Sequence, residues 1–259
     1  MESEGKIDKE SQLGELIKRR RIKLALFDLD DNLIITNPIF TGQIAKYADE
    51  VIKNLPPQID PITIRKKIAE ANNEAYETHS VRRDRWKPMA EILAKQFENE
   101  VGREGGLIFH KASSILEDIY TIPPKLREGA LETVETISKF AKTAIVTHGN
   151  EDWTNFKIDG LGLRESFDKV FIVPEGEHKE KDHWRAAVEY FGIPPKHALV
   201  SGDNIKGDII AASEAGVKNL VWMNFREGWS LYRKGDLPEG TLEISNMIEF
   251  IDKMLESWS

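Results

Sequence analysis

Short apolar runs recur along this chain, and longer polar stretches with helical spacing separate most of them. The runs have the length of buried β-strands, and they span residues 22–28, 143–147, 169–173, 198–201 and 219–223. Between them, apolar residues recur at helical spacing, as at Leu131, Val134 and Ile137. Strands that alternate with helices in this way form parallel sheets covered by helices on both faces. The pattern therefore predicts an α/β fold with a doubly wound parallel sheet.

The gap between the first two expected strands is too long for one crossover helix. Helical periodicity fills this gap, and Asp60 followed by Pro61 is a typical helix start. We therefore expect residues 37–123 to form an inserted α-helical domain. The α/β core is then made of two stretches, residues 1–36 and 124–259.

Two smaller expectations concern individual helices. The pair Gly105 and Gly106 should break the helical pattern inside the insert, because glycine is a poor helix former. Near the C-terminus, Met247, Ile251 and Met254 recur at helical spacing, which predicts a helix that packs on the core.

Composition limits the chemistry that this chain can perform. With 259 residues, of which 40% are hydrophobic, it can bury a sizeable core. The absence of cysteine excludes disulfides, thiolate catalysis and cysteine-ligated zinc. A net charge of −8 without a basic stripe argues against nucleic acid as a partner. No apolar run approaches a membrane span, and residues 1–21 lack a secretory signal, so we expect a cytoplasmic protein with no membrane partner. Its oligomeric state is left open.

Acidic residues follow the first expected strand directly. Asp28 and Asp30 lie two residues apart, so in extended backbone both side chains point to the same side. Two close carboxylates repel each other unless a cation or a shared proton intervenes. In α/β sheets, ligands bind at the carboxyl ends of the strands. This strand end therefore suits metal-assisted chemistry.

Later strand ends add complementary groups. Thr147 offers a hydroxyl, and Gly149 allows a ligand to approach the backbone closely. Asp203 follows another strand, and a lysine, Lys179 or Lys181, lies between these two strand ends. Together such groups can perform phosphoryl transfer, with a carboxylate nucleophile, a carboxylic acid, a Mg²⁺ ion and donors for the phosphate oxygens.

The chain resembles the haloacid dehalogenase-like hydrolases from about Ile22 to Met223. The stretch from Asp28 to Asn32 resembles the family's first motif, and Ile-Val-Thr147-His-Gly-Asn resembles the second. Lysine near position 179 stands for the third. Ser-Gly-Asp203-Asn-Ile-Lys-Gly-Asp208 is similar to the fourth. One departure is Asn32, where the family usually has threonine; an asparagine can still hydrogen-bond the strand-end backbone.

The resemblance implies a role for each matched residue. Asp28 would be the nucleophile and Asp30 the general acid and base. Mg²⁺ would be bound by Asp28, the carbonyl oxygen of Asp30 and Asp203. Asp208, also counted with the metal site, would orient the lysine or a metal-bound water.

The same resemblance implies a phosphate-binding group. Its expected members are Thr147, His148, Gly149 and Lys179. Lys179 is preferred to Lys181, because a lysine followed by Trp184 and a helix is similar to the spacing in several family members.

The function expected from these motifs is that of a Mg²⁺-dependent phosphatase that hydrolyses a small phosphorylated metabolite through an aspartyl-phosphate. A phosphomutase on the same scaffold is an alternative. Dehalogenation is disfavoured, because Asp30 supplies the acid that phosphate-ester cleavage needs. A receiver-type signalling domain is disfavoured by the order of the acids and by the helical insert. A non-catalytic binding protein of the same fold is favoured only by Asn32.

The insert resembles the family's α-helical C1 cap, which closes over small substrates. A basic and aromatic cluster lies within it, made of His79, Arg82, Arg83, Arg85 and Trp86. This cluster is either a solvated helix face or a clamp for an anionic or aromatic substrate. Under the second interpretation, Arg82 and Arg85 bind the substrate.

Overall fold

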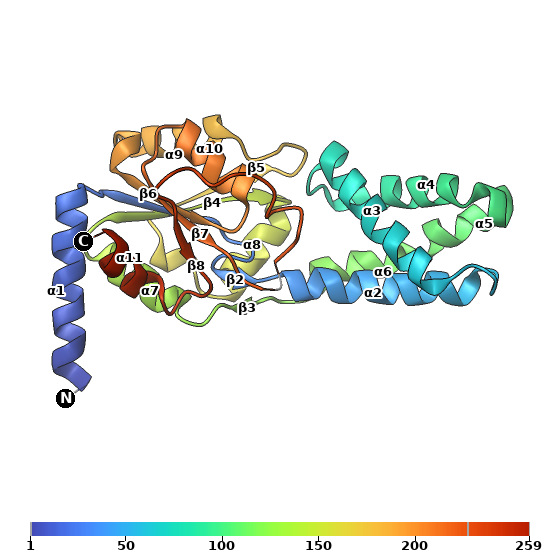
Figure 1. Ribbon diagram of the computed structural model, residues 1–259, viewed down its shortest axis with the longest axis horizontal. Helices are drawn as coiled ribbons and strands as arrows, with labels where there is room; N and C mark the ends of the chain where they lie inside the picture. Colours follow the sequence, from blue (N-terminus) through green and yellow to red (C-terminus); the bar gives the residue numbers. More distant parts are fainter. Residues whose placement is uncertain (1, 227, 259) are drawn as a thin grey trace.

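The computed structural model describes residues 2–226 and 228–258, with side chains from residue 9 onward. The molecule is elongated: an α/β region lies at one end and a bundle of helices projects from it (Figure 1). No helix in the described part of the chain is long and apolar enough to cross a membrane.

A six-stranded sheet forms the centre of the α/β region, with every neighbouring pair parallel. Its order is β5-β4-β1-β6-β7-β8. The strands are β1 (Leu24–Phe27), β4 (Lys142–Gly149), β5 (Lys169–Pro174), β6 (Ala198–Gly202), β7 (Asn219–Met223) and β8 (Leu242–Ile244). Every residue of β1, β6 and β7 is buried, because helices cover both faces of a parallel sheet.

Helices pack on both faces of this sheet. They are α1 (Glu2–Arg20), α7 (Ala130–Ser138), α8 (Glu151–Gly160), α9 (Lys181–Tyr190), α10 (Ala211–Glu214) and α11 (Phe250–Trp258), with short turns η3 (Arg164–Ser166), η4 (Pro195–His197) and η5 (Ile205–Ile210). One core cluster joins Phe27 of β1 to α1, α7 and α11, and another joins Leu26 to α9 and α10. Adjacent residues of one strand thus point into opposite cores, as the doubly wound prediction requires.

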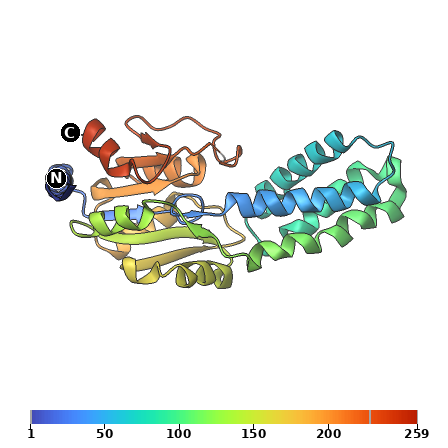
Figure 2. The same cartoon turned by 90° about the horizontal axis from the view of Figure 1, so that it is seen from below.

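The helical insert has a core of its own. Its elements are α2 (Asn37–Asn54), α3 (Pro61–His79), η1 (Arg83–Arg85), α4 (Trp86–Gln96), α5 (Glu98–Ala112), α6 (Ser114–Glu117) and η2 (Asp118–Thr121). Tyr47, Trp86 and Phe109 are fully or almost fully buried in one apolar cluster. Figure 2 shows the insert extending beyond one end of the sheet. As expected, Asp60 caps α3, where its carboxylate accepts a hydrogen bond from the Thr63 amide (2.9 Å).

A small antiparallel ladder ties together the two chain segments that enter and leave the insert. β2 (Ile34–Ile35) pairs with β3 (Lys125–Leu126). The Arg127 guanidinium donates to the Asp31 carbonyl (2.9 Å) and the Asn32 carbonyl (3.2 Å) beside this ladder.

The sequence-based prediction of an α/β fold with an inserted helical region is confirmed, but three details differ. No helix was expected near the N-terminus, but residues Glu2–Arg20 form helix α1, and this helix buries Leu13, Leu16 and Ile17. Strands β2, β3 and β8 were not expected. The break inside α5 lies at Gly102, with φ 67°, and not at Gly105 and Gly106.

Candidate active site

The carboxyl ends of β1, β4 and β6 meet at one side of the sheet, next to the insert. Asp28 follows β1 directly, and its amide donates to the Ser201 carbonyl of β6 (2.8 Å). A cavity of about 120 Å³ opens at this point. Expected site residues line it from the core, namely Asp28, Asp30, Thr147, His148, Gly149, Lys179, Asp203 and Asp208.

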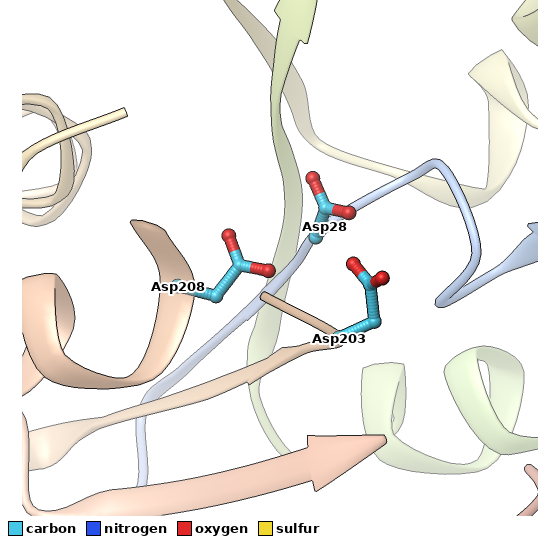
Figure 3. A group of neighbouring side chains, drawn as sticks. All are labelled: Asp28, Asp203 and Asp208. Atoms are coloured by element: carbon cyan, nitrogen blue, oxygen red, sulfur yellow. The ribbon is translucent and has the colours of Figure 1, made fainter. Parts of the chain in front are cut away.

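Three buried carboxylates converge on one point of the cavity. Asp28, Asp203 and Asp208 each place an oxygen within 4.8 Å of the others (Figure 3). Burial raises the pKa of Asp28 to about 8, with Lys179 opposing and Asp208 adding to the rise. Burial and the neighbouring carboxylates of Asp31 and Asp208 raise the pKa of Asp203 well above its ordinary value. Hard oxygen donors that crowd each other in this way fit a Mg²⁺ ion.

The Asp30 side chain is not part of this cluster. The expected roles of Asp30, with its carbonyl oxygen on Mg²⁺ and its carboxylate as general acid and base, stay predictions. Both carboxylate oxygens of Asp30 instead accept hydrogen bonds from the Lys157 ammonium, each at 2.6 Å.

Lys157 is a site residue that the sequence analysis missed. It belongs to α8 and its side chain is 1% exposed. The ammonium lies 3.8 Å from the centre of the Trp153 ring, which is one helical turn away. The only available signal was this Trp153–Lys157 spacing, and a lysine on a helix normally faces solvent.

Lys179 reaches the carboxylate cluster, whereas Lys181 does not. The Lys179 ammonium is ion-paired with Asp28 and with Asp208 (2.6 Å), and it donates to the Val146 carbonyl (3.2 Å). Although burial acts to lower it, the two carboxylates raise the pKa of Lys179 above its ordinary value. Lys181 is exposed at the first position of α9. The geometry thus favours Lys179 as the cation of the site.

Asp208 holds Lys179 in place. One oxygen pairs with the lysine, and the other accepts a hydrogen bond from the Asn204 amide (3.0 Å). Gly202 makes this packing possible, because a Cβ atom there would lie 2.2 Å from an Asp208 oxygen. The arrangement agrees with the expectation that Asp208 orients the lysine.

Asn32 fastens two strand ends to each other. Its amide nitrogen donates to the Asp28 carbonyl (3.0 Å) and the Ser201 carbonyl (3.3 Å), and its oxygen accepts from the Ser201 hydroxyl (2.9 Å). The asparagine therefore hydrogen-bonds the strand-end backbone, as expected for this departure from the family motif.

The third acid of the first motif, Asp31, anchors the insert. Its carboxylate accepts hydrogen bonds from the amides of Thr36 (2.9 Å) and Asn37 (2.8 Å), where α2 begins. Asp31 adopts a left-handed conformation, with φ 59°, at the point where the chain turns from Asp28 towards the insert. No role for Asp31 was expected from the sequence.

The two candidate arginines of the insert have different surroundings. Arg85 is buried and lines the cavity. Arg82 is about half exposed, and its guanidinium forms an ion pair with Asp84 (2.9 Å). Among the described residues, Arg85 but not Arg82 is placed to contact a ligand in the cavity.

The insert and the core meet around the cavity through hydrogen bonds and aromatic contacts. The Ser80 hydroxyl donates to the Glu177 carbonyl (2.6 Å), and the Trp229 indole donates to Asn73 (3.1 Å). Trp153 of α8 packs into the core of the insert, with ring centres 5.8 Å from Phe40 and 5.1 Å from Tyr120.

Known proteins that are similar to this chain agree with the resemblance indicated by its motifs. Residues 22–216 match the family described as haloacid dehalogenase-like hydrolase. The chain is 27% identical to glyceraldehyde 3-phosphate phosphatase of Pyrococcus furiosus over 214 residues. The aligned residues cover 80% of this chain and 82% of that protein.

Solved structures share the fold. A haloacid dehalogenase-like family hydrolase from Xanthomonas campestris superposes with a TM-score of 0.67 at 14% identity, covering 89% of this chain and 93% of the other. The HAD-hydrolase YfnB from Bacillus subtilis, a structure bound to magnesium, gives a TM-score of 0.57 at 23% identity, covering 89% and 97%.

Proposed function

Because this chain belongs to the haloacid dehalogenase-like hydrolase family, we propose that it is a Mg²⁺-dependent phosphatase that hydrolyses a small phosphorylated metabolite through an aspartyl-phosphate. The observation that supports this most directly is the position of Asp28. Asp28 lines the cavity, and its carboxylate lies beside two further acids and a buried lysine. A candidate nucleophile, a candidate site for a divalent cation and a buried positive charge thus lie together where the ends of β1 and β6 meet.

In the proposed first step, a carboxylate oxygen of Asp28 attacks phosphorus and the bond from phosphorus to the ester oxygen breaks. Asp30 gives its proton to the departing oxygen, which leaves as an alcohol. In the second step, Asp30 takes a proton from water while the water oxygen attacks phosphorus, releasing phosphate and restoring Asp28. Lys179 and the Thr147 hydroxyl hold the phosphoryl oxygens together with the backbone at His148 and Gly149.

Mg²⁺ would be held by Asp28, Asp203 and the carbonyl oxygen of Asp30. Asp208 would orient Lys179, with which it forms an ion pair. When bound, the ion offsets the negative charges of the carboxylates and the phosphate. Lys179 alone leaves part of that charge uncompensated, since it pairs with two of the three carboxylates and carries a single positive charge.

Residues 37–123 act in this proposal as a cap that covers the cavity and selects the substrate. The support is positional, because the insert begins six residues after Asp31 and several of its side chains line the cavity. A cavity of about 120 Å³ suits a small molecule. Contacts such as Ser80 to Glu177 hold the cap against the core and would exclude water during the reaction.

Turnover of p-nitrophenyl phosphate by the purified protein tests the proposal. Hydrolysis should require Mg²⁺, disappear with EDTA and return when Mg²⁺ is added in excess. Asp28→Asn should remove turnover, and an alkali-labile phosphate adduct should form in wild type but not in this variant. Full activity in EDTA, or appreciable turnover by Asp28→Asn in a folded sample, would contradict the proposal. A protein that binds phosphate esters but never turns them over would support the non-catalytic alternative.

A further inference from the structure

Arg85 is a buried cation on the cap side of the cavity. Its side chain lies among aromatic rings, and the residue is 4% exposed. The guanidinium carbon is 4.3 Å from the centre of the Trp86 ring and 5.4 Å from that of Phe40. Arginine keeps its charge in proteins, so the fold has taken a full positive charge out of water.

That charge has no anionic partner in the described part of the chain. The ion pairs of the neighbouring arginines go to Asp84 and Glu117, while Arg85 forms none. Its Nε atom is buried without a hydrogen-bond partner. The ionisable groups that act most on it are Tyr120, Tyr232 and Tyr76, which are neutral at ordinary pH. Stacking on two rings offsets only part of the cost of burying such a charge.

Other polar atoms without partners lie around the same cavity. The Asn72 side-chain oxygen and the Trp153 indole nitrogen are buried and have no hydrogen-bond partner among the described residues. Both residues line the cavity together with Arg85 and Asp28. Buried polar atoms are normally paired, and a polar ligand in the cavity would offer partners to the unpaired atoms of the residues that line it.

We propose that Arg85 binds a second anionic group of the substrate, a carboxylate or a second phosphate, while the phosphoryl group that is hydrolysed lies on Asp28 and Lys179. This inference rests on the proposed phosphatase function and narrows its substrate class. The true substrate is then a small phosphomonoester with another negative charge on its leaving group. A guanidinium binds either anion through two parallel hydrogen bonds.

Matched substrates test this on the wild-type holoenzyme. The probes are carboxymethyl, carboxyethyl and carboxypropyl phosphate, each beside the hydroxyalkyl phosphate of the same chain length. At one chain length or more, kcat/KM should be roughly 10- to 100-fold higher for the anionic probe, as expected for a hydrogen bond to a charged group. The matching alkanediol bisphosphates show whether a second phosphate is preferred to a carboxylate. Equal kcat/KM for charged and neutral probes at every chain length would overturn the proposal.

Variants assign the preference to a residue. Arg85→Gln should reduce the ratio between the anionic and neutral probes to near one, and Arg85→Lys should retain part of it. Arg82→Gln is the matched control, because Arg82 is exposed and already paired with Asp84; it should keep the wild-type ratio. If Arg82→Gln abolishes the preference and a folded Arg85→Gln retains it, the assignment is wrong.

A binding measurement separates this proposal from the proposed function. Calorimetric titration of carboxyethyl phosphate and hydroxypropyl phosphate into Asp28→Asn with Mg²⁺ needs no turnover. Tighter binding of the charged probe, lost in Asp28→Asn with Arg85→Gln, supports the role of Arg85 even if the wild type hydrolyses nothing. Hydrolysis of p-nitrophenyl phosphate without any preference in rate or binding would leave the phosphatase proposal intact and overturn this one.

Discussion

Two lysines that are two residues apart face different surroundings. Lys179 contacts Asp28 and Asp208, while Lys181 faces solvent at the start of α9. We expect Lys179→Ala to lower kcat by roughly 10²–10³-fold, the usual loss for one group that stabilises transition-state charge. Lys181→Ala should change kcat by less than about threefold, because surface substitutions have small effects. Steady-state kinetics with p-nitrophenyl phosphate measure both, and the reverse order of severity would refute the assignment.

The ion pair between Lys157 and Asp30 gives a second prediction at this scale. Lys157→Met keeps the packing under Trp153 but frees the Asp30 carboxylate. A misplaced catalytic group costs roughly 10²-fold in rate, so kcat should fall by about that factor. In an Asp30→Asn background, Lys157→Met should add little further loss, because the side chain that it positions is already disabled. Fully additive losses would indicate that Lys157 acts independently of Asp30.

These residues also show what a sequence reveals about a site. Asp28, Asp203 and Thr147 could be predicted because each lies at the end of an apolar run, and parallel strands end at the same edge. Lys157 could not, because its partner lies 127 residues away and its burial depends on how α8 packs. The same holds for the choice between Arg82 and Arg85, since neighbours in a short turn can point to solvent or into a cavity.

At the scale of elements, Asn32 joins the loop after β1 to the end of β6. Asn32→Ala would leave the Asp28 and Ser201 carbonyls without this donor in a buried place. We expect a loss of about 1–3 kcal/mol in the free energy of unfolding. Asn54→Ala is a suitable control, because that exposed amide donates only within α2 to Glu50 (2.8 Å) and should cost no more than about 0.5 kcal/mol. Urea denaturation compares the two, and equal losses would contradict the role given to Asn32.

Elements with strong periodicity could be predicted, and elements that depend on distant partners could not. The central strands β1, β6 and β7 consist mostly of apolar residues, so their positions follow from composition. Among its described side chains, helix α1 has a narrow apolar face made of Leu13, Leu16 and Ile17, and α11 packs against this helix. β2 and β3 are two residues each and exist only because the chain returns from the insert beside its point of departure.

At the scale of the whole molecule, the carboxylate cluster links stability to metal and pH. Mg²⁺ that binds only the folded state at about 100 times its Kd would add about 2.7 kcal/mol of stability. In a domain of this size, that corresponds to a rise in Tm of about 5–10 °C. The pKa values of Asp28 and Asp203 are raised, so protons compete with the ion at low pH. The rise in Tm should therefore be larger at pH 8 than at pH 5.

Differential scanning calorimetry with and without Mg²⁺ at both pH values measures this effect. Asp203→Asn should remove most of the increase, whereas Lys181→Ala, which leaves the cluster intact, should keep it. An equal rise at both pH values, or an undiminished rise in Asp203→Asn, would show that the ion binds elsewhere.

The contact of Trp153 with the insert limits how freely this protein can diversify. The insert is one contiguous stretch of the chain. Its replacement during evolution could change substrate specificity while the strands of the α/β region stay the same. Trp153 belongs to α8 of the α/β region, yet its ring packs against Phe40 and Tyr120 of the insert and covers Lys157. An insert taken from another protein would have to accommodate the Trp153 ring, because a shift of this ring would disturb the Lys157 ammonium that lies against it. Among descendants of this sequence, positions 40, 120 and 153 should therefore co-vary.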